Sequence, residues 1–278
     1  MSVTPLGWQC YQRSDFIAHM ANTLRSTLKL LGALPLLISY LIVSSAITMF
    51  VRSGQRKRLY LMRNTSFFSR PALKLLGVRI HSKHLERLHR DVSARLVVSN
   101  HLSYVDILAI SSLMPAVFIT SVEMKNTFLL GILSKLGGSV FIERRKVSGL
   151  KKEIETITHV LGHGFTVALF PEGTTSNGEY VRPFKNSLFE SAIKAKCDIL
   201  PLCLRYTKVN NRHITINNRD SIFYYGGVTL FGHFPRLLAL QSVDLEVHPL
   251  ETIRVHAHDS RKELAARAHS AITAAYHE

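Results

Sequence analysis

The feature that most constrains this chain is a long uncharged stretch near its N-terminus. No charged residue occurs between Leu30 and Val51, a run of 22 residues. As a helix, rising about 1.5 Å per residue, such a run is long enough to cross a hydrocarbon core roughly 30 Å thick. It is too long for the apolar part of a secretion signal, and no convincing small-residue cleavage site follows it. We therefore expect an N-terminal helical segment that anchors the chain in a membrane.

Pro35 leaves the form of this anchor open. Counted from Leu36 to Val51, the uncharged run has 16 residues, about 24 Å of helix, which is shorter than a full crossing. A helical hairpin that enters one leaflet is therefore an alternative to a transmembrane helix. Cations crowd the C-terminal flank of the run, namely Arg52, Arg56, Lys57, Arg58 and Arg63. This bias predicts that the chain after Val51 is cytoplasmic, at the inner (cytoplasmic) membrane if the protein is bacterial.

The charge of the chain indicates what it binds. The 278 residues carry a formal net charge of +16, which favours a polyanionic partner, either nucleic acid or anionic lipid. Residues 56–80 interleave basic with apolar side chains, a pattern typical of helices at a lipid head-group interface. The sequence has no recognisable nucleic-acid-reading motif. We predict an anionic membrane surface and no nucleic acid, with residues 1–80 as the membrane-anchoring and interfacial segment.

The remainder of the chain, residues 81–278, alternates short β-rich runs with helical stretches. Strands are expected at 95–99, 117–120, 139–142, 166–170 and 199–204, and helices at roughly 103–113, 123–136, 147–163 and 185–196. Such alternation predicts an α/β domain with a largely parallel central sheet flanked by helices. Residues 205–250 are expected to be β-rich and irregular, and residues 259–276 to form a closing helix.

The first chemical motif directly follows a predicted strand and runs from Ser99 to Asp106. Residues five apart on a continuous helix do not face each other, so His101 can meet Asp106 only from a loop that curls back over the first helical turn. In that arrangement the carboxylate would orient the imidazole, which could then act as a general base. The spacing from Ser103 to Asp106 also matches a helix capping box, and the motif alone favours neither interpretation.

Two further motifs follow predicted strands. The first runs from Gly138 to Arg144, and its arginine would stand where α/β folds bind ligands and could grip phosphate or carboxylate. The second runs from Phe170 to Gly178 and is followed by Lys185; its glycines, hydroxyls and backbone amides could form a nest for an anionic head group. Taken singly, each of these residues is better explained as a solvated loop charge or part of a tight polar turn.

Together the blocks resemble a known family. Asn-His-x-Ser-x-x-Asp (100–106), Gly-x-x-Phe-Ile-x-Arg (138–144), Phe-Pro-Glu-Gly-Thr (170–174) and an apolar strand with Pro201 resemble the glycerolipid acyltransferases, whose best-known members are 1-acylglycerol-3-phosphate acyltransferases. The resemblance covers about residues 90–210. It implies direct transfer of a fatty acyl group from acyl-CoA or acyl carrier protein to the hydroxyl of a lyso-lipid, without metal or organic cofactor. The first acceptor it suggests is 1-acylglycerol-3-phosphate, which would give phosphatidate.

The resemblance also implies roles for particular residues. His101 would be the catalytic base and Asp106 its partner. The residues implied in substrate binding are Asn100, Ser103, Gly138, Phe141, Arg144, Phe170, Pro171, Glu172, Gly173, Thr174 and Lys185.

The third block departs from the commonest pattern of the family. Many 1-acylglycerol-3-phosphate enzymes carry arginine at the position of Thr175 and glycine at that of Ser187. A lost cation weakens the expectation of a phosphomonoester acceptor, so another lyso-lipid, such as lyso-ornithine lipid, is an alternative. A non-enzymatic alternative is a basic membrane tether. No metal site is expected, because His159 and His163 have no clear third ligand.

Overall fold

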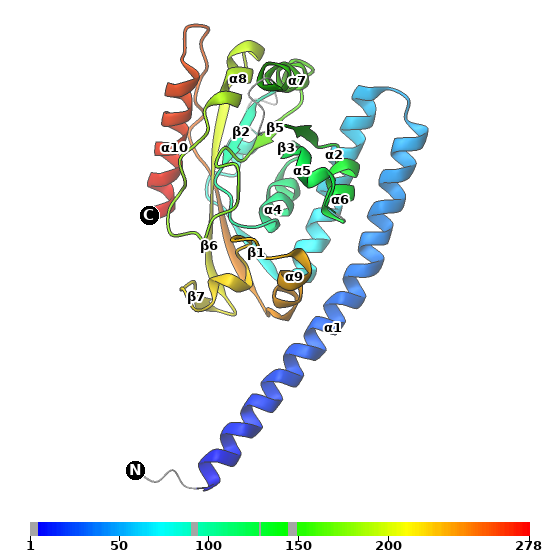
Figure 1. The fold of residues 1–278 in the computed structure, drawn as a ribbon, viewed down its shortest axis with the longest axis vertical. Coiled ribbons are helices and arrows are strands. Elements are labelled where there is room, and N and C mark those ends of the chain that lie inside the picture. Colours follow the sequence, from blue (N-terminus) through cyan, green and yellow to red (C-terminus); the bar gives the residue numbers. More distant parts are fainter. Residues whose placement is uncertain (1–4, 90–93, 128, 144–148) are drawn as a thin grey trace.

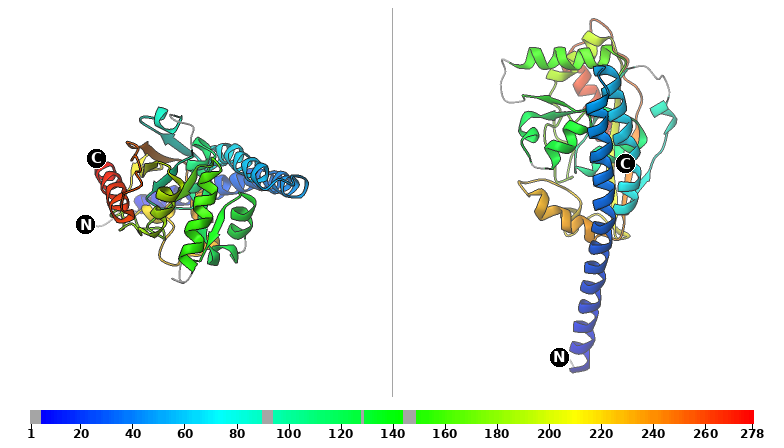
Figure 2. Two further views of the ribbon diagram at one scale, coloured as in Figure 1. Left: turned by 90° about the horizontal axis from the view of Figure 1, so that it is seen from above. Right: turned by 90° about the vertical axis from the view of Figure 1, so that its right-hand side faces the viewer.

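The structure is a computed structural model that describes residues 5–89, 94–127, 129–143 and 149–278. It begins with two long helices, α1 (Pro5–Phe50) and α2 (Gly54–Leu76), which run antiparallel beside an α/β body (Figure 1). The N-terminal half of α1 projects beyond the body (Figure 2). The predicted N-terminal helix is therefore present. Helix α1 continues through Pro35 without a break. The uncharged residues from Leu30 to Phe50 therefore lie on one helix, and not on a shorter helix that begins after the proline.

The helix pair shows two kinds of outer surface. Within the described residues, Met20–Phe50 is long and apolar enough to cross a membrane. Its exposed apolar side chains include Leu24, Leu28, Leu31, Ile38 and Ile42. The outward face of α2 instead alternates cations with aromatic rings, through Arg56, Tyr60, Arg63, Phe67, Arg70 and Lys74, all of them exposed.

Specific contacts hold α1 in place. The side chain of Asn64 donates to the Ser44 hydroxyl at 2.8 Å, and both residues are buried between the two helices. Lys29 donates to the carbonyl oxygens of Leu76 at 2.6 Å and Leu240 at 2.7 Å, at or next to the C-terminal ends of two other helices. A cation is favourable there, because the last carbonyls of a helix lack intrahelical partners and carry partial negative charge.

The body is built on one twisted sheet. In the described residues its strand order is β1-β8-β6-β2-β5-β3-β4, with β7 paired to β6. Strands β7 and β8 run antiparallel to β6, and the other pairings are parallel. The predicted fold, a largely parallel sheet flanked by helices, is confirmed. The strands are β1 (Val78–His81), β2 (Leu96–Ser99), β3 (Val117–Ser121), β4 (Val140–Ile142), β5 (Val167–Leu169), β6 (Ile199–Val209), β7 (Arg212–His213) and β8 (Val243–Pro249).

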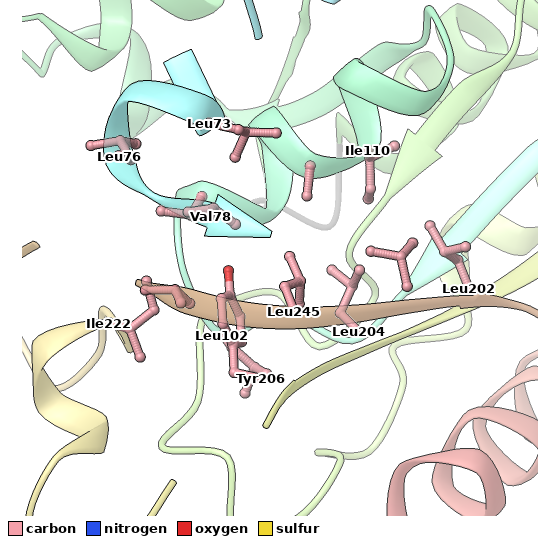
Figure 3. Close-up of a cluster of buried hydrophobic side chains, with 14 of the residues drawn as sticks. Leu73, Leu76, Val78, Leu102, Ile110, Leu202, Leu204, Tyr206, Ile222 and Leu245 are labelled. Carbon is pink, nitrogen blue, oxygen red and sulfur yellow. The ribbon is translucent and has the colours of Figure 1, made fainter. Parts of the chain in front are cut away.

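Helices cover both faces of the sheet, and alternate residues of the central strands β2, β5 and β6 feed two cores. Val97 of β2 joins the core beneath α2, α4 (Val105–Leu113) and α9 (Leu230–Ala239), which Figure 3 shows in part. Its neighbours Leu96 and Val98 join the core beneath α7 (Leu150–Gly162), α8 (Glu190–Ala195) and α10 (Arg261–His277). This period of two is expected for a strand buried on both faces.

Three expectations about helices need correction. The single helix expected at 123–136 is two helices, α5 (Val122–Lys125) and α6 (Leu130–Leu136), and the one expected at 185–196 is a 3₁₀ turn (Ser187–Phe189) followed by α8. Helix α9 lies in the stretch expected to be β-rich. It buries His233, Leu237 and Leu238 at helical spacing, so tertiary packing outweighs the β propensity of the segment. The closing helix is confirmed as α10.

Candidate active site

The candidate site lies where three neighbouring parallel strands end. Strand β2 pairs with β5 on one side and with β6 on the other, in parallel on both sides. The loop that follows β2 carries His101, and the loop that follows β5 begins at Phe170. The two loops are therefore neighbours at the carboxyl edge of the sheet, the usual location of ligand sites in open α/β folds.

His101 meets Asp106 as the spacing required. Helix α4 begins at Val105, so the histidine lies in the preceding loop, and its Nδ1 is 2.8 Å from Asp106 Oδ2. The same Oδ2 accepts backbone N–H groups of Leu102 at 2.7 Å and Ser103 at 2.9 Å. The carboxylate thus satisfies two backbone donors of the loop just before the helix and holds the imidazole at once, so both interpretations of the motif describe the same group. With Nδ1 engaged, Nε2 is the ring nitrogen that remains for chemistry.

The imidazole is also fixed by stacking. Its ring lies on the Phe170 ring, with centroids 3.9 Å apart and planes 12° apart, and Phe118 stacks behind Phe170 at 6.3 Å. The side chain of His101 retains 16% exposure while Asp106 is fully buried. Asp106 and Phe170 therefore hold the imidazole from the protein side, while part of the His101 ring is open to solvent.

Glu172 supports the same loop from β5. Its Oε1 accepts the backbone N–H of His101 at 2.9 Å, and its Oε2 accepts that of Arg182 at 3.3 Å. Burial, with a smaller contribution from the negative charge of Asp106, raises the pKa of this carboxyl to about 7, although the two backbone donors lower it. Both oxygens already have backbone partners, and the predicted contact of Glu172 with a head group stays a prediction.

Asn100 and Ser103 hold the ends of the loop. The Asn100 amide donates to the Leu204 carbonyl and accepts the Leu204 N–H, both at 2.8 Å, and so continues the ladder between β2 and β6. Ser103 is fully buried, and its hydroxyl accepts the N–H of Val105 at 3.4 Å. In the structure these predicted substrate ligands bind the protein itself, and their contact with substrate stays a prediction.

The third block lines a depression that shares Phe170 with the histidine site, although His101 is not among its described lining residues. Pro171, Gly173 and Lys185 line it together with Phe170, whose ring supports His101; its other lining residues are Ile142, Leu150, Glu153, Leu169, Ser187 and Leu188. Gly173 has φ +80°, and a Cβ there would lie 2.9 Å from Lys185 Nζ. The ammonium therefore lies over a glycine that no larger residue replaces without strain. Thr174, next in the chain, is exposed.

The second block lies farther along the sheet edge. Gly138 turns the chain out of α6 with φ +77°, and its Cα faces Leu61 of α2. Phe141 pairs with Thr120 of β3 and is half-buried. Arg144 falls outside the described residues, so its predicted role stays a prediction. Because β3 and β5 separate β4 from β2, neither Gly138 nor Phe141 is a direct neighbour of the histidine loop.

The sequence did not single out Tyr206. This residue lies on β6, a hundred positions beyond Asp106, and its hydroxyl donates to Asp106 Oδ1 at 2.7 Å. One signal was available, since a tyrosine inside an apolar strand needs a partner for its hydroxyl. The identity of that partner depends on the pairing of β6 with β2.

Comparison with known proteins agrees with this geometry. Residues 79–205 match the family described as Acyltransferase. The lyso-ornithine lipid O-acyltransferase of Brucella abortus is 31% identical over 253 residues, which cover 88% of this chain and 91% of that protein. The 1-acyl-sn-glycerol-3-phosphate acyltransferase of Neisseria gonorrhoeae is 39% identical over 111 residues, 40% of this chain and 44% of that one.

A solved structure shows the same fold. The crystal structure of the 1-acyl-sn-glycerophosphate acyltransferase of Thermotoga maritima superposes with a TM-score of 0.65, covering 94% of this chain and 96% of that one at 20% identity. The sequence matches include a relative of nearly the same extent. This chain therefore belongs to the glycerolipid acyltransferase family and is an O-acyltransferase rather than a non-enzymatic tether.

Proposed function

We propose that this enzyme moves a fatty acyl group from a thioester, acyl-CoA or acyl carrier protein, to the free hydroxyl of a lyso-lipid, with His101 as general base. The observation that carries the proposal is the pair formed by His101 Nδ1 and Asp106 Oδ2 at 2.8 Å, at the carboxyl edge of the sheet. A neutral imidazole held in this way is protonated on Nδ1 and presents a basic Nε2.

The proposed transfer has two steps. His101 Nε2 removes the proton of the acceptor hydroxyl as its oxygen attacks the thioester carbonyl, which gives a tetrahedral intermediate and an imidazolium. Asp106 stabilises the imidazolium through its negative charge. The intermediate then collapses, the carbon–sulfur bond breaks, and the departing thiolate takes the proton from Nε2. The products are an ester and a free thiol, and His101 returns to its starting state.

Lyso-ornithine lipid is the acceptor that we place first. The relative from Brucella abortus, named for this acceptor, matches over nearly its whole length. Thr175 supplies no cation where many phosphate-specific relatives have arginine, which disfavours a phosphomonoester. The carboxylate of an ornithine head group could pair with the ammonium of Lys185, which lies over Gly173 in the depression.

A second candidate acceptor is 1-acylglycerol-3-phosphate. The stretch shared with the enzyme from Neisseria gonorrhoeae has higher identity, 39% over 111 residues. Lys185 and the block that contains Arg144 would then hold the phosphate. Both acceptors have one acyl chain and one free hydroxyl, and the chemistry at His101 is the same for either.

We further propose that α1 and α2 hold the enzyme on an anionic membrane, with the catalytic body on the cytoplasmic side. The exposed apolar face of α1 supports contact with lipid chains, and the exposed cations of α2 support contact with anionic head groups. This arrangement would deliver a membrane-dissolved acceptor to a body that receives its thioester from the cytoplasm.

An acceptor panel tests the function. Purified full-length protein in vesicles containing anionic lipid is given labelled acyl-CoA or acyl-loaded carrier protein. The acceptors are lyso-ornithine lipid, 1-acylglycerol-3-phosphate and a lysophospholipid with a zwitterionic head group. We expect kcat/KM for lyso-ornithine lipid to exceed the others by at least about tenfold. The reverse preference would replace our first acceptor with the second. Transfer to none of them would contradict the proposed function.

A further inference from the structure

The carboxylate of Asp106 has an unusually complete set of donors. Its Oδ2 accepts from the His101 ring and from two backbone N–H groups, and its Oδ1 accepts the hydroxyl of Tyr206 at 2.7 Å. Both residues are buried, Asp106 completely and Tyr206 with 4% exposure. Water therefore cannot replace a missing donor at Oδ1.

The surroundings of Tyr206 are apolar except near its hydroxyl group. Its ring lies in the apolar core beneath α4, among Leu102, Leu204 and Ile222 (Figure 3). The hydroxyl contacts the side chains of Ser103 and Asp106. Burial, and then the charge of Asp106, raise the pKa of Tyr206 well above its ordinary value. The hydroxyl therefore keeps its proton and acts as a donor to the carboxylate.

Three segments thus meet in one chain of hydrogen bonds. Strand β6 supplies Tyr206, the first turn of α4 supplies Asp106, and the loop after β2 supplies His101. A donor on Oδ1 fixes the orientation of the carboxylate and withdraws part of its negative charge from the imidazole. Both effects act on His101 through Asp106, and Tyr206 itself contacts neither the imidazole nor the depression through any described interaction.

We propose that Tyr206 is a positioning residue for the acyl transfer, which sets the orientation and basicity of His101 through Asp106. The inference rests on the proposed role of His101. Without the hydroxyl, Oδ1 lacks a donor in an apolar core, an arrangement that is strongly unfavourable. The carboxylate then shares more of its charge with the imidazole, which keeps its proton to higher pH.

The test compares Tyr206→Phe with the wild type in the vesicle assay across pH. We expect kcat to fall about tenfold with KM changed less than about twofold, and the acidic limb of the kcat/KM profile to move to higher pH. Tyr225→Phe is the matched control, because the Tyr225 hydroxyl also donates to a carboxylate at 2.7 Å, that of Asp220, outside the network of Asp106. It should leave the acidic limb in place.

A second variant keeps the test decisive if Tyr206→Phe does not fold. Site-specific 3-fluorotyrosine at position 206 retains the hydroxyl at almost the same volume and makes it a stronger donor, so the acidic limb should move to lower pH. A limb that stays in place in whichever variants fold, with kcat within twofold of the wild type, would overturn the inference. His101→Ala separates the two proposals: if it is inactive while Tyr206 variants behave as wild type, only the inference fails. If His101→Ala stays active, the proposed function itself fails.

Discussion

The histidine loop and the α1–α2 pair differ in which groups they bury and which they expose. Around His101, polar groups are buried and each has a named partner, from Asp106 and Glu172 to the amide of Asn100. On the helix pair, apolar groups are exposed in number, from Leu24 to Ile42, and cations line α2. A buried polar network gives rigidity, whereas a large exposed apolar surface indicates contact with a membrane or another protein. We infer that the first region sets the rate and the second sets the location.

The largest effect on activity is expected from a change at Asp106, in the histidine loop region. Asp106→Asn would keep much of the shape, but its amide would favour the wrong imidazole tautomer and lose the negative charge. We expect kcat to fall by about 10³–10⁴, by analogy with the effect of the same change in serine proteases. Binding to anionic vesicles should be unchanged, as measured by sedimentation. A variant that loses membrane binding along with activity would show that the two regions are not separate.

The complementary change, on α1, is expected to reduce membrane binding and leave the chemistry intact. Leu31, Ile38 and Ile42 are exposed by 64%, 46% and 63%. Each contributes about 1.5–3 kcal/mol if its side chain is buried in lipid, so replacing all three by serine should lower vesicle partitioning by at least about 100-fold. Activity on a short-chain, water-soluble acceptor should stay within twofold of wild type.

A matched control for this variant is Ile216→Ser. Ile216 is exposed by 73% on a loop after β7, so Ile216→Ser removes one exposed apolar side chain outside the helix pair and is compared with Ile42→Ser alone. It should bind vesicles as the wild type does. Equal losses in both proteins would mean that general surface hydrophobicity, rather than α1, controls binding.

A smaller effect, on the pH dependence of stability, is expected from Glu172 in the buried network. Since the pKa of Glu172 is raised from 4.5 to about 7 in the fold, the folded state holds this proton more tightly than the unfolded chain. The corresponding stability is fully present below about pH 4.5 and is lost as the pH rises through about 7, at a total of roughly 3 kcal/mol.

Glu172→Gln removes this titration. Urea unfolding between pH 5 and 8 should show a shallower fall in the free energy of unfolding for the variant than for wild type, even though the glutamine amide fits one of the two backbone donors poorly. Parallel curves for the two proteins would contradict the raised pKa.

How far the sequence predicts this molecule depends on whether the relevant contact is local. The pairing of His101 with Asp106 was predictable because five residues and a strand-to-helix turn determine it. The parallel sheet was predictable from alternating runs, and the long apolar N-terminal helix from the absence of charge. Each of these inferences uses a single stretch of chain.

Contacts between distant strands were not predictable in the same way. The hydrogen bond from Tyr206 to Asp106, and that from the His101 backbone to Glu172, depend on β6 and β5 flanking β2. Helix α9 was missed for a related reason, because its buried residues pack under strands β6 and β8 that lie on either side of it in sequence. Register across a sheet is set by the whole core.

The most direct test of the account is the turnover of His101→Ala in vesicles, measured beside His159→Ala as the control. His159 is exposed on α7, outside the site. The account predicts that His101→Ala folds, binds vesicles as wild type does, and transfers acyl groups at least about 10³ times more slowly, while His159→Ala is unchanged. Transfer by His101→Ala at a rate within tenfold of wild type would contradict the assignment of His101 as the base.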